Sequence, residues 1–217
     1  MGFLPEQKNG LKGINTRRNL VVNSNGKSEM ILKAALNAFS KKGYHATRME
    51  NIAKIAGVGK GTLYEYFSNK EELFREALEY ATRIYFEDIS KAVEEGASVE
   101  EKILGILKVE CNTKKKYDNF AFTFLRESAN VEMDFKKFIY RIREIKIDLY
   151  SRIIKNAVVE GVYCEDLDVD LAATILMGAL NQVQFKNFYH GLNDFSIDDT
   201  RNTLKILDHG FKKKQFS

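Results

Sequence analysis

Proline is almost absent from this chain of 217 residues, which contains only Pro5. Proline removes a backbone amide donor and clashes inside a helix, so its absence from residue 6 onward favours long helices. No apolar run approaches the roughly 20 residues that a membrane-spanning helix needs, and the N-terminus lacks the apolar core of a signal peptide. The sequence therefore predicts a mostly helical protein without a membrane partner.

Cysteine and histidine are scarce as well. The two cysteines, Cys111 and Cys164, and the three scattered histidines fit neither a metal-ligand spacing nor a disulfide framework. We therefore expect no metal, no cofactor and a reducing, cytoplasmic setting. Hydrophobic residues make up 44% and charged residues 29% of the chain, which excludes the composition of a disordered protein.

The charge of the chain is unevenly distributed. The formal net charge is +4, but residues 1–78 contain 13 Lys and Arg against 7 Asp and Glu, whereas residues 79–217 contain 21 against 23. A basic N-terminal third attached to a near-neutral remainder indicates an anion-binding head on a body with another task. Charge alone is equally compatible with a solvated basic surface.

Residues 1–26 are rich in Asn, Gly and Lys and predict a flexible basic extension. Two interpretations are open for Arg17 and Arg18 in this extension: they belong to a disordered tail, or they form an arm that binds phosphate groups. The extension gives way at Ile31 to a regular apolar pattern.

Apolar residues recur every three or four positions from Ile31 onward, which is typical of amphipathic helices. Glycines follow several of these segments, and four pairs match the capping box that begins a helix: Thr47 with Glu50, Ser68 with Glu71, Ser98 with Glu101, and Ser196 with Asp199. We predict an all-α fold of about nine helices and no strand, over residues 31–43, 47–57, 60–67, 68–96, 98–111, 117–131, 134–160, 168–190 and 196–213.

The second and third of these helices are short and are separated by about four residues, which is the spacing of a helix-turn-helix. In that motif the third helix places its N-terminal residues in the major groove of DNA. Gly59 and Gly61 let the backbone approach DNA closely, and Lys60 adds positive charge. Thr62 and Tyr64 suit contacts with base edges or phosphates, although Tyr64 could instead pack inside the head.

Further phosphate contacts are expected at the edges of this motif. Tyr66 lies two residues after Tyr64 and could reach the flanking DNA backbone. Lys70 lies at the start of the next helix, where free amides and the helix dipole attract phosphate. Thr47 and Arg48 occupy the equivalent place on the second helix.

The same residues carry a resemblance to the tetracycline-repressor (TetR) family of transcriptional regulators. It covers about residues 27–85, and more than a dozen positions agree in register. The matching segments are Ile31-Leu32-x-x-Ala35-x-x-x-Phe39-x-x-x-Gly43-Tyr44, Ala46-Thr47, Ile52-Ala53, Ala56-Gly57-Val58, Gly61-Thr62-Leu63-Tyr64-x-Tyr66-Phe67 and Lys70-Glu71-x-Leu73.

The resemblance implies a homodimer that binds a pseudo-palindromic operator in double-stranded DNA, with a helical C-terminal domain that binds a small-molecule effector. It implies DNA contacts by Lys60, Gly61, Thr62, Tyr64, Tyr66 and Lys70, with Thr47, Arg48 and Gly59 nearby. Many family members carry Ser or Thr where this chain has Gly59, so a phosphate-binding hydroxyl is missing here. We expect a repressor, divided into an extension (1–26), a DNA-binding domain (27–85) and an effector-binding and dimerisation domain (86–217).

Two other classes of protein compete with this interpretation. The segment from Gly57 to Thr62 resembles the end of a phosphate-binding loop, which would indicate a phosphotransferase. Such a loop needs a glycine where this chain has Lys54, and it must follow a strand rather than a helix. The second alternative is an α-helical adaptor whose basic head binds a protein or a membrane, but the head lacks the pattern of an interfacial helix. We therefore do not expect an enzyme.

The body has an aromatic-rich middle, which ordinary core packing also explains. A cavity among the middle helices would bind a largely apolar effector, and the residues expected to line it are Tyr85, Cys111, Phe120, Phe124, Arg126 and Phe138. The helices around 168–190 and 196–213 are more broadly apolar than one core-facing stripe requires. We expect them to pair with a second subunit in a four-helix bundle, through Leu176, Leu180, Leu204 and Leu207.

Overall fold

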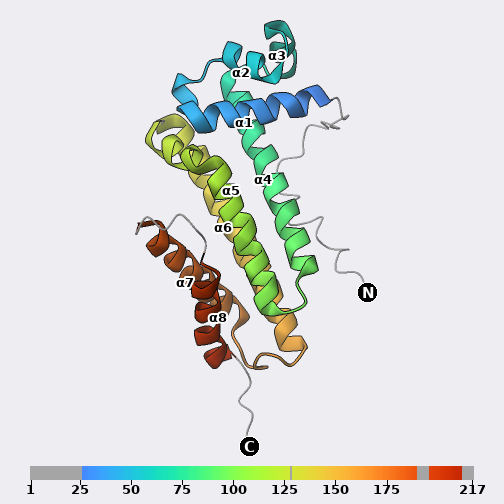
Figure 1. Ribbon diagram of the computed structural model, residues 1–217, viewed down its shortest axis with the longest axis vertical. Coiled ribbons are helices and arrows are strands. Elements are labelled where there is room, and N and C mark those ends of the chain that lie inside the picture. Colours follow the sequence, from blue (N-terminus) through green and yellow to red (C-terminus); the bar gives the residue numbers. More distant parts are fainter. Residues whose placement is uncertain (1–25, 128, 190–195, 212–217) are drawn as a thin grey trace, which may run out of the picture. The chain divides into compact units, whose positions relative to one another are not determined.

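The structure, a computed structural model, describes residues 26–127, 129–189 and 196–211, and within these ranges the side chains outside 114–139 and 187–189. This part of the chain is helices joined by short turns (Figure 1). They are α1 (Gly26–Ala46), α2 (Met49–Ala56), α3 (Lys60–Tyr66), α4 (Lys70–Glu95), α5 (Val99–Glu127), α6 (Ala129–Val159), α7 (Val169–Tyr189) and α8 (Ile197–Phe211). The predicted all-α class is confirmed. The expected extension, with Arg17 and Arg18, lies outside the described residues.

Eight helices are described rather than the nine predicted, because α5 continues from the predicted helix 98–111 through most of the predicted helix 117–131, and α6 begins at Ala129. The break expected near residues 114–116 is wrong. The sequence there is three consecutive lysines, which favour helix, and neither glycine nor proline interrupts it.

The chain divides into two compact units, and each has an apolar core of its own. Unit 1 comprises residues 1–86 and 115–132, and unit 2 comprises residues 87–114 and 133–217. The most deeply buried large side chains of unit 1 are Ile31, Phe39, Ile52, Leu63 and Leu73. Those of unit 2 are Ile89, Ile103, Ile106, Leu107, Tyr150, Ile154 and Leu176. By residue number, α4, α5 and α6 each contribute to both units.

Unit 1 contains the predicted helix-turn-helix, in which α2 packs against α1 and α3 follows α2 after a tight turn (Figure 1). Gly57 ends α2 with φ 67° and ψ 28°, and its amide donates to the carbonyls of Ala53 and Lys54. A side chain in this left-handed conformation would cost about 1–2 kcal/mol, so glycine is the residue that suits the turn.

Two of the four predicted capping boxes are wrong in detail. The N-cap of α2 is Arg48 rather than Thr47, and no side chain caps it. At α4 the box lies one residue later than predicted. Asn69 Oδ1 accepts a hydrogen bond from the amide of Glu72 at 2.8 Å, and the Glu72 carboxylate accepts one from the amide of Ser68 at 2.8 Å.

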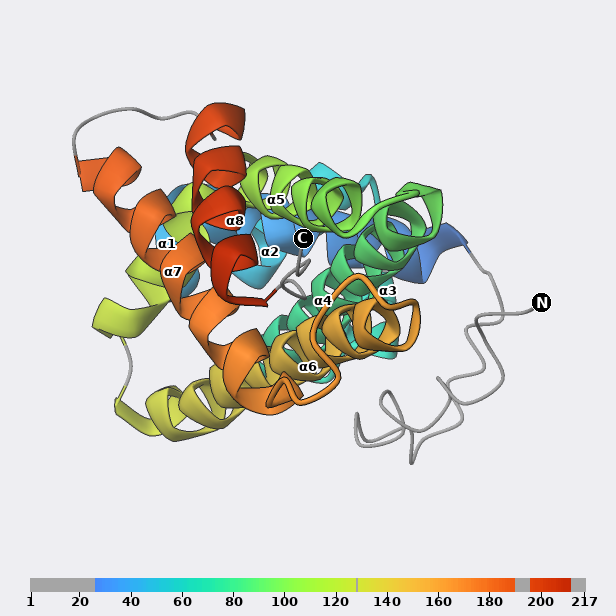
Figure 2. The ribbon, with the colours of Figure 1, turned by 90° about the horizontal axis from the view of Figure 1, so that it is seen from below.

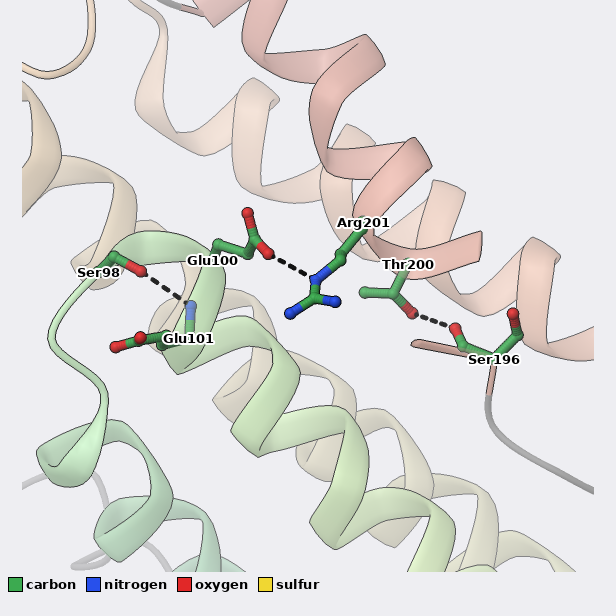
Figure 3. A network of polar contacts seen from close by, with 6 residues as sticks. All are labelled: Ser98, Glu100, Glu101, Ser196, Thr200 and Arg201. Carbon is green, nitrogen blue, oxygen red and sulfur yellow. Dashed lines mark hydrogen bonds and ion pairs between the residues drawn. The ribbon is translucent and has the colours of Figure 1, made fainter. Parts of the chain in front are cut away.

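The two predicted caps in unit 2 are confirmed, and Figure 3 shows the first of them, at Ser98. Ser98 Oγ accepts a hydrogen bond from the amide of Glu101 at 3.2 Å, and Ser196 caps α8 in the same way at 3.0 Å. Near these ends, Arg201 Nε on α8 donates to Glu100 Oε1 on α5 at 2.9 Å. The starts of two helices that are distant in sequence are therefore joined.

The turn after α6 is tied to the end of α8. The Tyr163 hydroxyl donates to Asp208 Oδ1 at 2.9 Å, and the amide of Cys164 donates to the carbonyl of Phe211 at 2.9 Å. Burial and the nearby Asp208 carboxylate raise the pKa of Tyr163, so this phenol stays protonated and keeps donating.

The leucines expected at the subunit interface lie on α7 and α8, which run side by side (Figure 2). Leu176 and Leu180 are each 2% exposed and Leu204 is 5% exposed within a single chain, while Leu207 is half-buried. The first three therefore belong to the core of unit 2. Sequence periodicity marks two apolar faces on α7 but does not say which one faces the chain's own core.

Candidate nucleic-acid interface

Helix α3 has one face turned into unit 1 and one turned to solvent. Leu63 is fully buried, and Phe67, just after the helix, is 5% exposed. On the opposite face Tyr64 is 42% exposed, and Lys60 and Gly61 are also exposed. Tyr64 therefore does not pack inside, which removes one of its two interpretations.

The first turn of α3 offers open space around its backbone. A Cβ built on Gly61 meets no atom within 4 Å, and a Cβ on Gly59 meets only Thr62 Oγ1, at 3.9 Å. Neither glycine has a positive φ. Packing and backbone strain within the chain therefore do not require glycine at either position, and Gly61 weakens a helix that alanine would favour.

Lys60 is joined to the preceding helix. Its Nζ lies 2.7 Å from Glu50 Oε1 on α2, and both side chains are well exposed. The hydrogen bond from Lys60 lowers the pKa of Glu50, and the carboxylate raises the pKa of Lys60. Both groups are therefore charged at neutral pH, and the exposed pair can open at little cost when another anion approaches Lys60.

Thr47 holds the turn between α1 and α2. Its side chain is 1% exposed, and its hydroxyl is 2.6 Å from the carbonyl oxygen of Gly43 and 3.3 Å from that of Ala38. Carbonyls at a helix end lack partners within the helix, so a buried hydroxyl satisfies them. The hydroxyl of Thr47 is thus turned into unit 1 rather than toward solvent.

Lys70 joins the start of α4 to the same turn. Its Nζ donates to the carbonyls of Tyr44 at 2.9 Å, Thr47 at 3.2 Å and His45 at 3.4 Å. The ammonium also lies 4.3 Å from the centroid of the Tyr44 ring, which packs edge-on against Phe74 at 5.1 Å. A cation at carbonyls near the end of α1 is electrostatically favourable.

The other expected contact residues are accessible to different degrees. Arg48 is exposed at the start of α2, whereas Thr62 and Tyr66 are half-buried on α3. The expected contacts thus fall into two groups. Most lie on or beside the outer face of α3, while Thr47 and Lys70 are engaged at the α1–α2 turn.

The residues expected to bind an effector are only partly described. Tyr85 is half-buried, with its ring centroid 4.9 Å from that of Phe86, and Cys111 is half-buried. The side chains of Phe120, Phe124, Arg126 and Phe138 lie outside the described residues.

Unit 2 contains buried polar groups, of which sequence reasoning considered Glu110 as a ligand contact but missed Lys146, Arg141 and Gln184. Lys146 Nζ on α6 lies 2.6 Å from Glu110 Oε1 on α5, and these side chains are only 14% and 11% exposed. Arg141 on α6 and Gln184 on α7 each bury a nitrogen atom that has no hydrogen-bond partner. No sequence signal distinguishes these residues from ordinary surface positions. Across the part of the chain described, no group of three or more His, Cys, Asp or Glu could hold a metal ion, and no helix is long and apolar enough to cross a membrane.

The contacts of Lys70 generate a prediction about stability. Lys70→Met keeps most of the aliphatic chain but removes the ammonium from three carbonyls. We expect the free energy of unfolding to fall by about 1–3 kcal/mol, because the carbonyls lose a charged donor. Urea denaturation measures this loss, and Lys54→Met, at an exposed lysine of α2, is the matched control. Equal stability of the two variants would contradict a structural role for Lys70.

Comparisons with known proteins agree with this geometry. Residues 31–77 match the family model described as bacterial regulatory proteins, tetR family. The chain is 26% identical over 152 residues to the fatty acid metabolism regulator protein of Bacillus subtilis, covering 70% of this chain and 78% of that protein. It is 34% identical over 101 residues to the regulator RutR of Escherichia coli, covering 46% of this chain and 47% of that protein.

Solved structures share the fold. The regulator FadR from Bacillus subtilis in complex with stearoyl-CoA aligns with a TM-score of 0.62 at 24% identity, over 84% of this chain and 98% of that one. FadR from Bacillus halodurans aligns with a TM-score of 0.63 at 24% identity, over 85% and 95%. Both relatives are named as regulators, and RutR as a transcriptional regulator of the helix-turn-helix type. Residues 31–77 therefore form a domain of the tetR family of bacterial regulatory proteins, and the chain is similar over most of its length to a regulator protein of fatty acid metabolism.

Proposed function

We propose that this regulator is a cytoplasmic, non-catalytic repressor that leaves a pseudo-palindromic operator when a largely apolar effector binds. In this proposal residues 27–85 bind DNA, and residues 86–217 bind the effector and the second subunit. The single observation that carries the DNA-binding part is the outer face of α3, where Lys60, Gly61 and Tyr64 are exposed on a helix anchored by buried Leu63.

The proposed DNA contacts follow from the accessibility of each side chain. Those that lie on or beside α3 and can reach DNA directly are Arg48, Gly59, Lys60, Gly61, Thr62, Tyr64 and Tyr66. Thr47 and Lys70 would act indirectly, by holding the α1–α2 turn against α4. A positioning role explains why a motif residue can have its polar group engaged within the head and still matter for DNA affinity.

Gly61 provides a test in which stability and binding move in opposite directions. Gly61→Ala should stabilise the free protein by about 0.5–1 kcal/mol, because alanine favours helix and its Cβ meets open space. The same methyl group should obstruct the close approach of α3 and weaken operator binding about tenfold per half-site, or about 1.4 kcal/mol. Thermal melting and fluorescence anisotropy measure the two effects.

The matched control is Asn37→Ala, at an exposed position in the middle of α1. It also improves helix propensity but should leave operator affinity unchanged. If Gly61→Ala binds the operator as tightly as the wild type, the proposed close approach of α3 is wrong.

The relatives support a fatty-acyl effector. One similar regulator is named for fatty acid metabolism, and a similar structure was solved with stearoyl-CoA. Binding to one of two conformations shifts their populations, and a hundredfold loss of operator affinity requires a coupling free energy of only about 2.7 kcal/mol.

The effector prediction is tested on an operator selected from a random DNA pool. We expect stearoyl-CoA to release the protein from this operator, with operator affinity falling about a hundredfold at saturation, while coenzyme A alone has little effect. Anisotropy titrations against labelled duplex give the affinities, and a scrambled duplex gives the non-specific background. Unchanged operator binding in saturating stearoyl-CoA would exclude this effector class.

The proposed dimer uses the faces of α7 and α8 that the chain leaves uncovered. On α7 the exposed side chains Leu171, Ile175 and Phe185 share a face with Gly178, where a Cβ meets no atom within 4 Å. On α8 Ile206 is 71% exposed. Small residues beside exposed apolar ones let helices approach closely, so a two-fold axis would form a four-helix bundle from two α7–α8 pairs.

Ile175→Glu should convert the dimer to a monomer while the helical circular dichroism is unchanged, because Ile175 is 44% exposed in one chain. Burial of unpaired carboxylates in the interface opposes association. Val159→Glu, at a position 79% exposed on α6, is the control and should remain dimeric. Sedimentation velocity separates the two species, and a dimeric Ile175→Glu protein would place the interface elsewhere.

A further inference from the structure

Two nitrogen atoms buried in unit 2 lack hydrogen-bond partners. They are Nη2 of Arg141 on α6 and Nε2 of Gln184 on α7, and each is inaccessible to solvent. More than nine in ten buried polar groups in proteins are paired, so each of these donors calls for an explanation. An orphaned guanidinium nitrogen is the more costly of the two, because it carries part of a charge.

Arg141 lies near the middle of α6, and Gln184 lies near the end of α7. The two helices are consecutive, and Ser151 Oγ on α6 donates to Asp170 Oδ1 on α7 at 3.1 Å. At a rise of about 1.5 Å per residue, Arg141 lies about 15 Å from Ser151 along α6, away from the intervening turn, and Gln184 lies about 21 Å from Asp170 along α7. Both donors therefore lie beyond the Ser151–Asp170 contact, on the side away from the turn that connects their helices.

Gln184 shares the buried apolar face of α7, and the cation Lys146 on α6 is already paired. Gln184 follows Leu180 by one helical turn, on the face that Leu180 and Met177 bury, at 2% and 3% exposed. On α6 the charge of Lys146 is matched by Glu110 at 2.6 Å. Among the described residues no carboxylate is paired with Arg141, and its Nη2 has no hydrogen-bond partner.

We propose that Arg141 and Gln184 bind oxygen atoms in the head of an anionic, amphipathic effector. The planar guanidinium suits a carboxylate or a phosphate, and the amide of Gln184 suits a carbonyl or hydroxyl oxygen. The apolar chain of the effector would lie along the buried face of α7. This inference rests on the proposed function, because it names the head-group chemistry of the proposed effector.

Removal of a buried polar group changes the melting temperature of the empty protein in opposite directions, depending on whether the group serves ligand binding or stability. An unpaired buried donor destabilises the empty protein, so Arg141→Met and Gln184→Met should melt at or above the wild-type temperature without ligand. Lys146→Met removes the cation that lies 2.6 Å from the nearly buried Glu110 carboxylate, and this variant should melt lower. Arg143→Met, at an exposed position on the same helix, should change nothing.

Isothermal titration calorimetry with three probes then identifies the head group. Stearoyl-CoA, stearate and coenzyme A are each titrated into the wild type, Arg141→Met and Arg143→Met. We expect Arg141→Met to lose about tenfold or more in affinity for the probe that the wild type binds. A loss confined to stearate assigns a carboxylate to Arg141, and a loss confined to stearoyl-CoA assigns an oxygen of the coenzyme.

Two results would overturn this inference and leave the proposed function standing. One is a ligand-free Arg141→Met protein that melts below the wild type. The other is an Arg141→Met protein that binds the probes as tightly as the wild type. If the wild type binds none of the three probes, the fatty-acyl effector of the proposed function is wrong. The ligand class inferred from Arg141 and Gln184 is then wrong as well.

Discussion

The contact on which the DNA-binding head depends is the ammonium group of Lys70 at the turn between α1 and α2. One charge at the start of α4 bonds to three carbonyls of that turn and lies over the ring of Tyr44. The buried hydroxyl of Thr47 bonds to the carbonyls of Gly43 and Ala38 in α1. Because α2 begins directly after this turn and α3 follows α2, the direction of α3 is set by polar contacts that lie outside α3 itself.

In that arrangement the outer face of α3 is not needed for packing within unit 1. Leu63 and Phe67 anchor the helix inward, so Gly61, Tyr64 and Lys60 are free of packing constraints. Glu50 keeps Lys60 in a charged, exposed ion pair. Such a pair contributes little to stability and exchanges readily for another anion. The head is therefore rigid where it holds its own turns and adaptable where DNA would approach.

The body places its polar groups differently. Glu110 and Lys146 satisfy one another in a nearly buried pair, whereas Arg141 and Gln184 each keep an unsatisfied buried donor. Beside them α7 is apolar on both faces, one covered by the chain's own core and one exposed. Unsatisfied donors and uncovered apolar surface both reduce the stability of an isolated chain, and both are removed by binding, of a ligand in one case and of a second subunit in the other.

The sequence by itself determined the helical class, the position of the turn at Gly57 and two of the four helix caps, because periodicity and capping are local properties. It left the outward direction of Tyr64 open. It placed the Thr47 cap wrongly, because the Thr47 hydroxyl bonds to carbonyls of α1 instead. It placed the Ser68 cap wrongly, because the next residue, Asn69, caps α4. It assigned Leu176 and Leu180 to a subunit interface, because an apolar side chain suits the core of its own chain and a subunit interface equally well. Only the tertiary structure decided that Lys70 bonds to the α1–α2 turn and that Arg141 and Gln184 bury unpaired donors, since burial and pairing depend on residues far away in the sequence.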